Sequence, residues 1–417
     1  MKRPMAMNPR VPRVAIVSTH PIQYHTPWFR ALAARPDIQV TVLYCHKATP
    51  RDQAQAGFGV QFEWDVSLLD GYAWEFLPNV ASTPGVSFWG LNTPALPRRI
   101  TRGEYDAVVL NGWHYRSAWQ AIQACWRSGT PVLARGDSHL QTPRHPVKIA
   151  AKWPFYRLFI PRLAACLPVG AWSREYFLHY GARPGRVFEV PHTVDSDRIS
   201  RQASACLEQR AELRRKWDLP EEDVVFLFSG KLIPRKRPLD FVRAIAQARR
   251  MGASVSGLVA GDGVLRSDCE TEARQSAAPI RFAGFLNQTE IVQAYVAADA
   301  LALPSDGSET WGLVVNEAMV CGRPCFLSDR IGCTPDLIDP GKTGAVFPCG
   351  DVDGLAALMK QYAGRPTLHD MGEHARRKIG AFTPATAADR LAAAVHAALS
   401  SHAAVSRRAA LSSRYQP

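Results

Sequence analysis

The chain has 417 residues and a mass of 46.0 kDa, more than one ordinary core accommodates, so two domains are the first expectation. Hydrophobic residues make up 47% and charged residues 21%, a balance that excludes a mostly disordered or fibrous protein. The formal net charge is +13, and residues 1–200 carry +10 of it, from 23 Lys and Arg against 13 Asp and Glu. We therefore expect the first half to meet an anionic partner.

Several absences narrow the class of protein further. The nine cysteines form no CxxC pair and no cluster with histidines, the pattern of reduced thiols rather than of a zinc site. No apolar run reaches the roughly 18–20 residues of a membrane-spanning helix. Arg10 and Arg13 interrupt the region where a signal peptide would have its apolar core. These features predict a cytoplasmic protein.

The first half alternates short apolar runs with helices. Strands are expected at 14–18, 40–45, 106–110, 131–134 and 165–169, and helices at 26–35, 116–127 and 148–161. Thr26 followed by Pro27 is typical of an N-cap and first turn. Apolar runs separated by helices indicate a parallel sheet that is covered on both faces.

Residues 57–90 interrupt this alternation with many aromatic residues among Gly and Pro. A long irregular insertion in a compact domain is usually functional or disordered. Its aromatic content argues against disorder, and a lid packed over the core is the other interpretation.

The second half follows a polar connection near 196–204. Six runs predict strands at 224–229, 254–260, 281–283, 300–304, 324–328 and 345–347. Asn287 and Glu290 have the spacing of a capping box, and a final helix at 384–399 precedes a tail that we expect to fray. The expected organisation is two doubly wound α/β domains at 1–198 and 205–383, with a terminal helix and tail at 384–417. Ligands are then expected in the cleft at the carboxyl ends of the strands.

A basic cluster follows the predicted strand at 224–229. Within seven residues the chain has the cations Lys231, Arg235, Lys236 and Arg237. Gly230 precedes them and lets backbone approach a ligand closely. Such a cluster suits a diphosphate, although a solvated basic turn would have the same composition.

Two acids lie further along, with seven residues between them. Glu309 follows the predicted strand at 300–304, and Glu317 lies within the next helix. Gly312 allows the chain to pass close to a ligand, and the amides at the helix start can receive an anion. Glu309 could hold sugar hydroxyls and Glu317 the hydroxyls of a ribose. The alternative is a capping acid followed by a surface acid.

Together these motifs resemble the donor half of the large retaining glycosyltransferases of family 4. The matching pieces are Gly230 and Lys231 with Lys236, Gly261-Asp262-Gly263, 282–285, Glu309 to Glu317, 319–324, 341–344 and, in the first half, 190–195. The resemblance implies the GT-B fold, in which two Rossmann-like domains face each other across a cleft and the C-terminal helix crosses back.

The resemblance also implies roles in the donor half. Lys231 and Lys236 would neutralise the leaving nucleoside diphosphate, with UDP or GDP expected. Glu317 would bind the ribose hydroxyls, and Glu309 would lie near the transferred sugar. The other donor-binding candidates are Gly230, Arg235, Gly261, Asp262, Gly263, Trp311, Gly312 and Leu313.

The acceptor half offers fewer matches. His114, after the strand at 106–110, is our choice for the histidine that faces the sugar, and His20, after the first strand, is its rival. Arg135 and Asp137 follow the strand at 131–134 and are expected to face the same cleft. A structural histidine is the alternative for His114.

Two departures from the family pattern affect these expectations. The family often has a Gly-Gly turn after the first strand, where this chain has His20 within residues 19–23. It also often has two glycines where this chain has Gly332 and Cys333, and the Cys333 side chain is expected to narrow the sugar pocket.

The expected reaction is transfer of a sugar with retention, without a cofactor and without a metal, because cations and helix amides can stabilise the leaving diphosphate. A sugar-nucleotide epimerase or phosphorylase on the same fold is the main alternative, and a non-catalytic sensor is the third. A nicotinamide enzyme is disfavoured because no GxGxxG follows the first strand. A nucleic-acid partner is also disfavoured, because the cations are spread over the first half rather than grouped in a recognised module.

Residues 148–162 mix basic and aromatic side chains at helical spacing. Such a surface can rest on anionic lipid headgroups, although a core helix with basic rims would read the same way. We expect a cytoplasmic enzyme, peripheral on the inner face of the membrane, with a lipid-linked or cell-surface glycan as acceptor.

Overall fold

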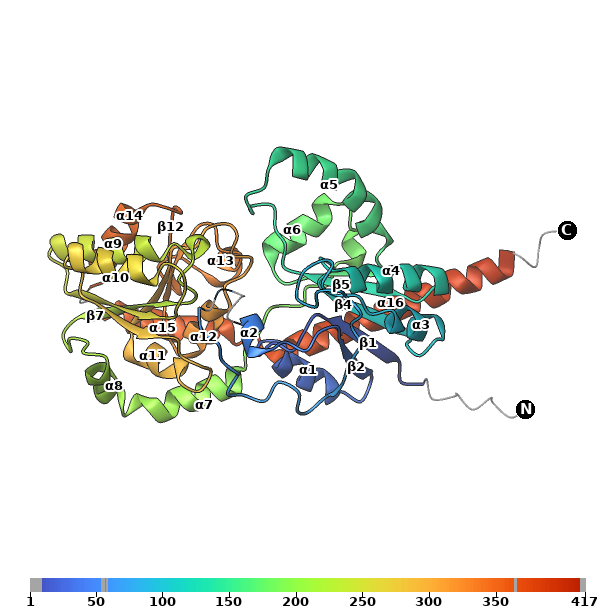
Figure 1. Cartoon of the computed structure of the whole chain (residues 1–417), viewed down its shortest axis with the longest axis horizontal. Helices are drawn as coiled ribbons and strands as arrows, with labels where there is room; N and C mark the ends of the chain where they lie inside the picture. The colour runs from blue at the N-terminus through green and yellow to red at the C-terminus, as the bar shows by residue number, and fades with distance from the viewer. Residues whose placement is uncertain (1–9, 54–56, 58, 364–365, 413–417) are drawn as a thin grey trace.

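The computed structural model describes residues 10–412 except 54–56, 58, 364 and 365. Within these residues the chain forms two six-stranded parallel sheets with helices on their faces, and the two halves lie side by side (Figure 1). The α/β architecture with two doubly wound sheets is therefore confirmed.

The first sheet has the strand order β3-β2-β1-β4-β5-β6. Its strands are β1 (Arg13–Ser18), β2 (Gln39–Tyr44), β3 (Ala73–Phe76), β4 (Ala107–Asn111), β5 (Val132–Gly136) and β6 (Ala165–Pro168). The helical segments of this half are α1 (Thr26–Ala33), α2 (Pro50–Gln53), α3 (Ala95–Thr101), α4 (Arg116–Ser128), α5 (Pro146–Phe159), η2 (Ile160–Arg162), α6 (Ala171–His179) and η3 (Pro184–Arg186). The order of the strands reverses between β1 and β4, which is where such sheets place a ligand.

The second sheet has the order β12-β11-β10-β7-β8-β9, and its order reverses between β7 and β10. Its strands are β7 (Val224–Ser229), β8 (Val255–Ala260), β9 (Ile280–Gly284), β10 (Ala300–Leu303), β11 (Cys325–Ser328) and β12 (Gly344–Phe347). The helical segments are α7 (Ser196–Leu207), α8 (Arg210–Lys216), η4 (Pro234–Lys236), α9 (Pro238–Arg250), α10 (Arg266–Gln275), α11 (Ile291–Ala297), α12 (Leu313–Val320), α13 (Thr334–Leu337), α14 (Val352–Tyr362), α15 (Thr367–Ile379) and α16 (Pro384–Ser412).

The insertion at 57–90 is not irregular throughout. It contains β3, which pairs in parallel with β2 so that Tyr44 lies opposite Phe76. This strand forms the edge of the sheet, and its first three residues are exposed. A four-residue edge strand has too few buried positions to produce an apolar run, so the sequence did not reveal it.

Two local expectations at helix starts are corrected. α1 begins at Thr26 itself, whose hydroxyl donates to the carbonyl of Leu68 at 2.9 Å instead of capping the helix. The expected capping box is incomplete: the Glu290 side chain accepts from the Asn287 amide at 3.4 Å, but the Glu290 amide donates to the backbone carbonyl of Asn287 and not to its side chain. The Asn287 side chain instead donates to the carbonyl of Glu63 at 2.8 Å.

The polar stretch at 196–204 is helical, not an open connection. It forms most of α7, and Ile199 and Ala203 are buried in the core of the second half. We therefore place the first crossing between the halves before Ser196.

The C-terminal helix α16 crosses back to the first half, as expected (Figure 1). It packs on α1 and β6 through a buried apolar face that includes Leu391 and Val395. His396 Nε2 lies 3.0 Å from Asp37 Oδ2 at the rim of this contact. The helix continues to Ser412, beyond the expected end at 399, and the expected frayed tail at 413–417 lies outside the described residues. Among the helices that the structure describes, none is long and apolar enough to cross a membrane.

Candidate active site

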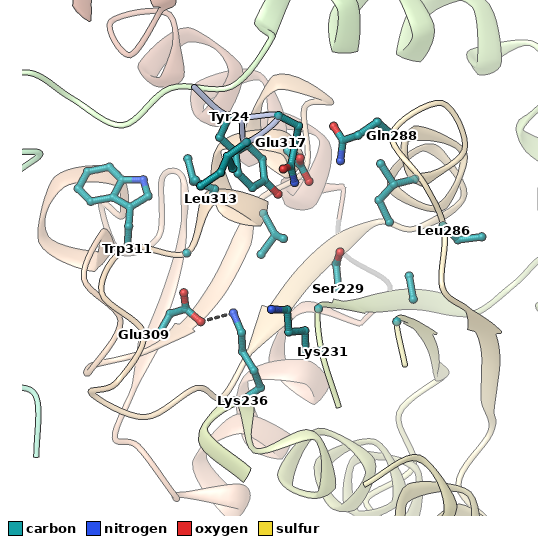
Figure 2. Close-up of a pocket in the computed structure, with 18 of the residues that line it drawn as sticks. Tyr24, Ser229, Lys231, Lys236, Leu286, Gln288, Glu309, Trp311, Leu313 and Glu317 are labelled. Carbon is teal, nitrogen blue, oxygen red and sulfur yellow. Dashed lines mark ion pairs between the residues drawn. The ribbon is translucent and has the colours of Figure 1, made fainter. Parts of the chain in front are cut away.

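A cavity of about 460 Å³ lies between the two halves at the carboxyl ends of their strands. Loops that follow β1 and β5 line it from the first half, and loops that follow β7, β8 and β10 line it from the second. In Figure 2, Lys231 and Lys236 lie in the middle, Glu309 and Trp311 on one side, and Leu286 and Gln288 on the other. The cavity volume lies within the usual range for small-molecule sites.

The basic cluster after β7 faces this cavity. Lys231, Arg235 and Lys236 all line it, and the short helix η4 turns the chain so that Lys236 comes back beside Lys231. The Lys236 ammonium forms an ion pair with Glu309, drawn as a dashed line in Figure 2. Burial, and then the charges of Arg235 and Lys236, lower the pKa of Lys231 to about 8. An anion placed among these cations would relieve their mutual repulsion.

The loop after β8 touches the loop after β7. A Cβ atom at Gly261 would lie 2.0 Å from the carbonyl oxygen of Gly230, so only glycine permits this approach. Gly230, Gly261 and Asp262 line the cavity, as predicted. Gly263 does not line it, because its backbone packs against the main chain of Leu232.

Helix α12 points its first turn at the cavity. Gly312 precedes the helix with a φ of 94°, a conformation that glycine adopts without strain, and both Gly312 and Leu313 line the cavity. Trp311 lines it as well, and its indole nitrogen donates to Asn316 Oδ1 at 2.9 Å. These contacts hold the start of α12 in place, so that its positive dipole end faces the cavity.

Glu317 lies one turn into α12 and is only 2% exposed. The hydroxyl of Tyr295 donates to its Oε2 at 2.7 Å. Burial raises the pKa of this carboxyl. Tyr24, from the other half, and Gln288 lie beside it (Figure 2). The carboxyl thus forms part of the cavity wall, with Tyr24, Gln288 and Tyr295 around it.

The structure separates the two candidate histidines. His20 lines the cavity, and burial, followed by the nearby His46, lowers its pKa to about 4, so its ring is neutral at pH 7. His114 is exposed and does not line the cavity; its ring packs edge-on against Tyr115 at 5.6 Å between centroids. The geometry therefore favours His20 over our first choice, since His114 turns to the surface after β4.

The two acceptor-side candidates after the strand at 131–134 differ in position. Asp137 lines the cavity and accepts from the hydroxyl of Thr310 at 2.7 Å, a contact that links the two halves. Arg135 is buried behind the cavity wall, where it donates to the carbonyl of Pro191 at 3.1 Å. Its burial lowers its pKa to about 10. Arg135 thus supports the wall instead of reaching the ligand space.

Other lining residues were not among the predicted ones. Tyr24 follows His20 in the same loop, whereas Trp64, His192 and Gln288 come from three separate segments. Tyr24 shares a predicted strand-end loop with His20, and His192 lies in the segment 190–195 that matches the family, whereas Trp64 and Gln288 had no comparable signal. The expected effect of Cys333 is also corrected: its side chain is fully buried and does not line the cavity.

Comparisons with known proteins agree with this geometry. The model of the family described as glycosyl transferases group 1 matches residues 209–378, which include the basic cluster and both acids. A D-inositol 3-phosphate glycosyltransferase of Streptomyces scabiei is 30% identical over 330 residues, 73% of this chain and 69% of that protein. Another, from Geodermatophilus obscurus, is 31% identical over 240 residues, 54% of this chain, and the match spans only 50% of that relative.

Solved structures show the same architecture. The crystal structure of Anabaena Alr3699/HepE in complex with UDP and glucose aligns with a TM-score of 0.66 at 15% identity, over 92% of this chain and 99% of that one. A glycosyltransferase from Rickettsia africae aligns with a TM-score of 0.71 at 13% identity, over 94% and 99%. Because the likeness to the Streptomyces scabiei protein extends over more than two thirds of that relative, the chain belongs to the glycosyl transferases group 1 family and has the GT-B fold.

Proposed function

We propose that this glycosyltransferase moves a sugar from a nucleoside-diphosphate sugar to a glycan or lipid-linked acceptor, with retention and without a metal. One observation carries the proposal. Lys231, Lys236 and the first turn of α12 meet in one cavity with Glu309 and Glu317. The fold and the family membership support transfer over the epimerase or phosphorylase alternative.

The donor half has the groups that this chemistry needs. Breaking the bond between the sugar and the diphosphate leaves positive charge on the sugar and adds negative charge to the diphosphate. Lys231, Lys236 and the α12 amides are aimed at one region before the reaction starts, which is how a preorganised site stabilises a developing anion. Among the described residues, no group of three or more His, Cys, Asp or Glu side chains could hold a metal ion. Metal independence itself is tested by assaying transfer in EDTA.

Retention by front-face attack is supported by the state of the acids that line the cavity. Glu309 is paired with Lys236, Asp262 with Arg266, and Asp137 accepts a hydrogen bond from Thr310. The fourth acid that lines the cavity, Glu317, is buried in α12 and accepts from the hydroxyl of Tyr295. All four carboxylates thus already have a partner, and none is placed as an unpaired nucleophile for a double displacement. NMR of the anomeric proton in the first product tests retention against inversion. Mass spectrometry of the enzyme during turnover, which would reveal a covalent glycosyl-enzyme, distinguishes double displacement from front-face attack.

Donor binding is the first experiment. Titration with UDP-, GDP- and ADP-sugars should show saturable binding of at least one, followed by slow hydrolysis or transfer of its sugar. Glu317→Ala should weaken that binding, while Glu104→Ala, a change at an acid outside the cavity, should not. Failure of every nucleotide sugar to bind would remove the proposal.

Helix α5 supports contact with an anionic membrane surface. Of its residues only Phe159 is buried, so the helix is not a core helix with basic rims. Its exposed large apolar side chains are Val147, Ile149, Trp153, Phe155 and Leu158. The exposed Lys148 and Arg157 lie among them, and this mixture suits anionic headgroups above an acyl layer. We therefore propose that the enzyme is cytoplasmic and peripheral on the inner face of the membrane.

Flotation with vesicles tests this contact. Wild-type protein should float with phosphatidylglycerol vesicles at low salt and less so at high salt. The double change Trp153→Ser with Leu158→Ser should abolish flotation, whereas Leu207→Ser, at an apolar residue of α7 that is 53% exposed, should leave it unchanged. Equal flotation of all three proteins would argue against α5 as the contact surface.

A further inference from the structure

A short segment of the insertion leaves the first half and lies on the second. We call residues 59–65 the strap. At one end of the strap, a Cβ atom at Gly59 would lie 3.2 Å from the backbone nitrogen of Gly263. In its middle, the ring of Phe62 packs on the ring of Phe285 with centroids 4.2 Å apart. The strap therefore bridges the cleft beside the cavity.

Asp65 fastens the other end of the strap. Its Oδ1 accepts from the backbone amide of Gln288 at 3.0 Å, and its Oδ2 accepts from the amide of Thr289 at 3.0 Å. The side chain of Asn287 donates back to the carbonyl of Glu63 at 2.8 Å. Hydrogen bonds to residues 287–289 thus hold both neighbours of Trp64, Glu63 and Asp65, and so fix the position of Trp64 itself.

Trp64 lines the cavity. It is half-buried and packs edge-on against Phe62, with centroids 4.8 Å apart. Phe285, Leu286 and Ile291 line the cavity from the second half. An aromatic and aliphatic lining from both halves thus lies at one end of the space.

The other part of the cavity is charged. In Figure 2, Leu286 lies on the opposite side of Lys231 and Lys236 from Glu309, and Glu317 lies above the lysines. The nucleotide part of a nucleotide sugar has matching groups in the same order: a flat aromatic base, a ribose with two hydroxyls and a doubly charged diphosphate. The proposed function places the diphosphate at the basic cluster, the ribose at Glu317 and the sugar near Glu309. The base has no assigned contact, and the apolar end of the cavity is left for it.

We infer that Trp64 forms one face of the subsite for the nucleobase, so that the donor's base is held between the two halves of the chain. This inference rests on the proposed function, since it concerns the nucleotide part of the same donor. Stacking on an aromatic ring accepts any base because each base has a π-face. The strap positions the ring, and Asp65 is the residue that positions the strap.

Isothermal titration with free nucleotides tests the inference. The ligands are UDP, GDP and inorganic pyrophosphate, and the proteins are wild type, Trp64→Ala, Trp64→Phe and Trp89→Ala. Trp89 is a matched control, because it belongs to the same insertion, is 71% exposed and does not line the cavity. Trp64→Ala should weaken binding of the preferred nucleotide by about 5- to 150-fold, the range for loss of one base–aromatic stack. Its binding of pyrophosphate should stay within about twofold of wild type.

Conservative variants separate stacking from a general loss of structure. Trp64→Phe keeps an aromatic face and should recover most of the nucleotide affinity, and the control Trp89→Ala should bind as wild type does. Asp65→Ala should lower nucleotide affinity and leave pyrophosphate affinity intact, and Asp65→Asn, whose amide oxygen can still accept one hydrogen bond, should restore part of it.

Each result has a definite meaning. Equal binding of the nucleotide by wild type and Trp64→Ala would overturn the inference and leave the proposed function standing. A parallel loss of pyrophosphate binding would also overturn it, because the ring would then be supporting the cavity as a whole. Failure of wild-type protein to bind any nucleoside diphosphate would instead remove the proposed function, on which the inference rests.

Discussion

Affinity for a nucleoside diphosphate is expected to fall as the pH rises from 7 to 9, because Lys231 loses its proton within that interval. Its pKa is lowered to about 8, first by burial and then by Arg235 and Lys236, while the charge of Glu309 opposes the shift. The sign follows directly: the ammonium form, which attracts the diphosphate, is populated below pH 8 and is lost above it.

The size of the effect follows from this value. If only the protonated form binds, about nine tenths of the protein is competent at pH 7 and about one tenth at pH 9. The apparent dissociation constant should therefore rise about tenfold over these two pH units, equivalent to about 1.4 kcal/mol. The slope should approach one decade per pH unit at the upper end of the interval.

Titration calorimetry with the preferred nucleotide at several pH values measures this directly. Lys231→Arg is the matched variant, because a guanidinium stays protonated throughout this interval, and its affinity should be nearly constant. Lys231→Met, which never carries the charge, should bind weakly at every pH. A flat profile in wild type would refute the reasoning, and so would the same decline in Lys231→Arg, which would assign the titration to another group or to the ligand.

Three further predictions follow from the geometry. Glu317→Ala should weaken binding of the donor by at least about tenfold, because hydrogen bonds to a buried charged group are strong, and Glu317→Gln should lose less; equal binding by all three proteins in calorimetry would exclude this acid from the site. His20→Ala should lower the turnover number, whereas His114→Ala should leave it unchanged, and steady-state assays that gave the reverse would restore the exposed histidine as the candidate. Asp299→Ala should lower the free energy of unfolding by about 3 kcal/mol in urea, because it removes the partner of the buried Arg214 guanidinium at 2.6 Å; a change below about 1 kcal/mol would contradict this.

Most strands of the second half were predictable because they are short apolar runs buried on both faces; the exception is the edge strand β9, in which only Ile280 is buried. The run at 224–229 coincides with β7, and the others differ from their strands by one or two residues. The donor-side residues followed from this, since Lys231 and Glu309 come directly after strands whose carboxyl ends share one edge of a sheet. Local sequence placed these residues at the edge of the sheet, and the resemblance to the glycosyltransferase family supplied their expected roles.

The remaining features depend on contacts between distant segments. β3 forms by pairing with β2, where Phe76 lies opposite Tyr44. Its four residues are exposed or half-buried, so their sequence gives no signal of that pairing. The positions of Tyr24 and Trp64 against the second half depend on how the two halves meet. His114 and His20 both follow central strands, and only the path of each loop decides which of them reaches the cavity.

The return of α16 has a consequence for how this protein is made. Leu391 and Val395 complete the apolar layer against α1 and β6, so the first domain is assembled from two stretches of chain with the whole second domain between them. During synthesis the second half can close its own core while the first still exposes one face of its sheet. A fragment that stops at the first crossing would lack the part of this layer that α16 supplies and would expose the apolar side chains of α1 and β6 beneath it. The first domain is therefore the last to be completed, because part of its core comes from residues after Pro384.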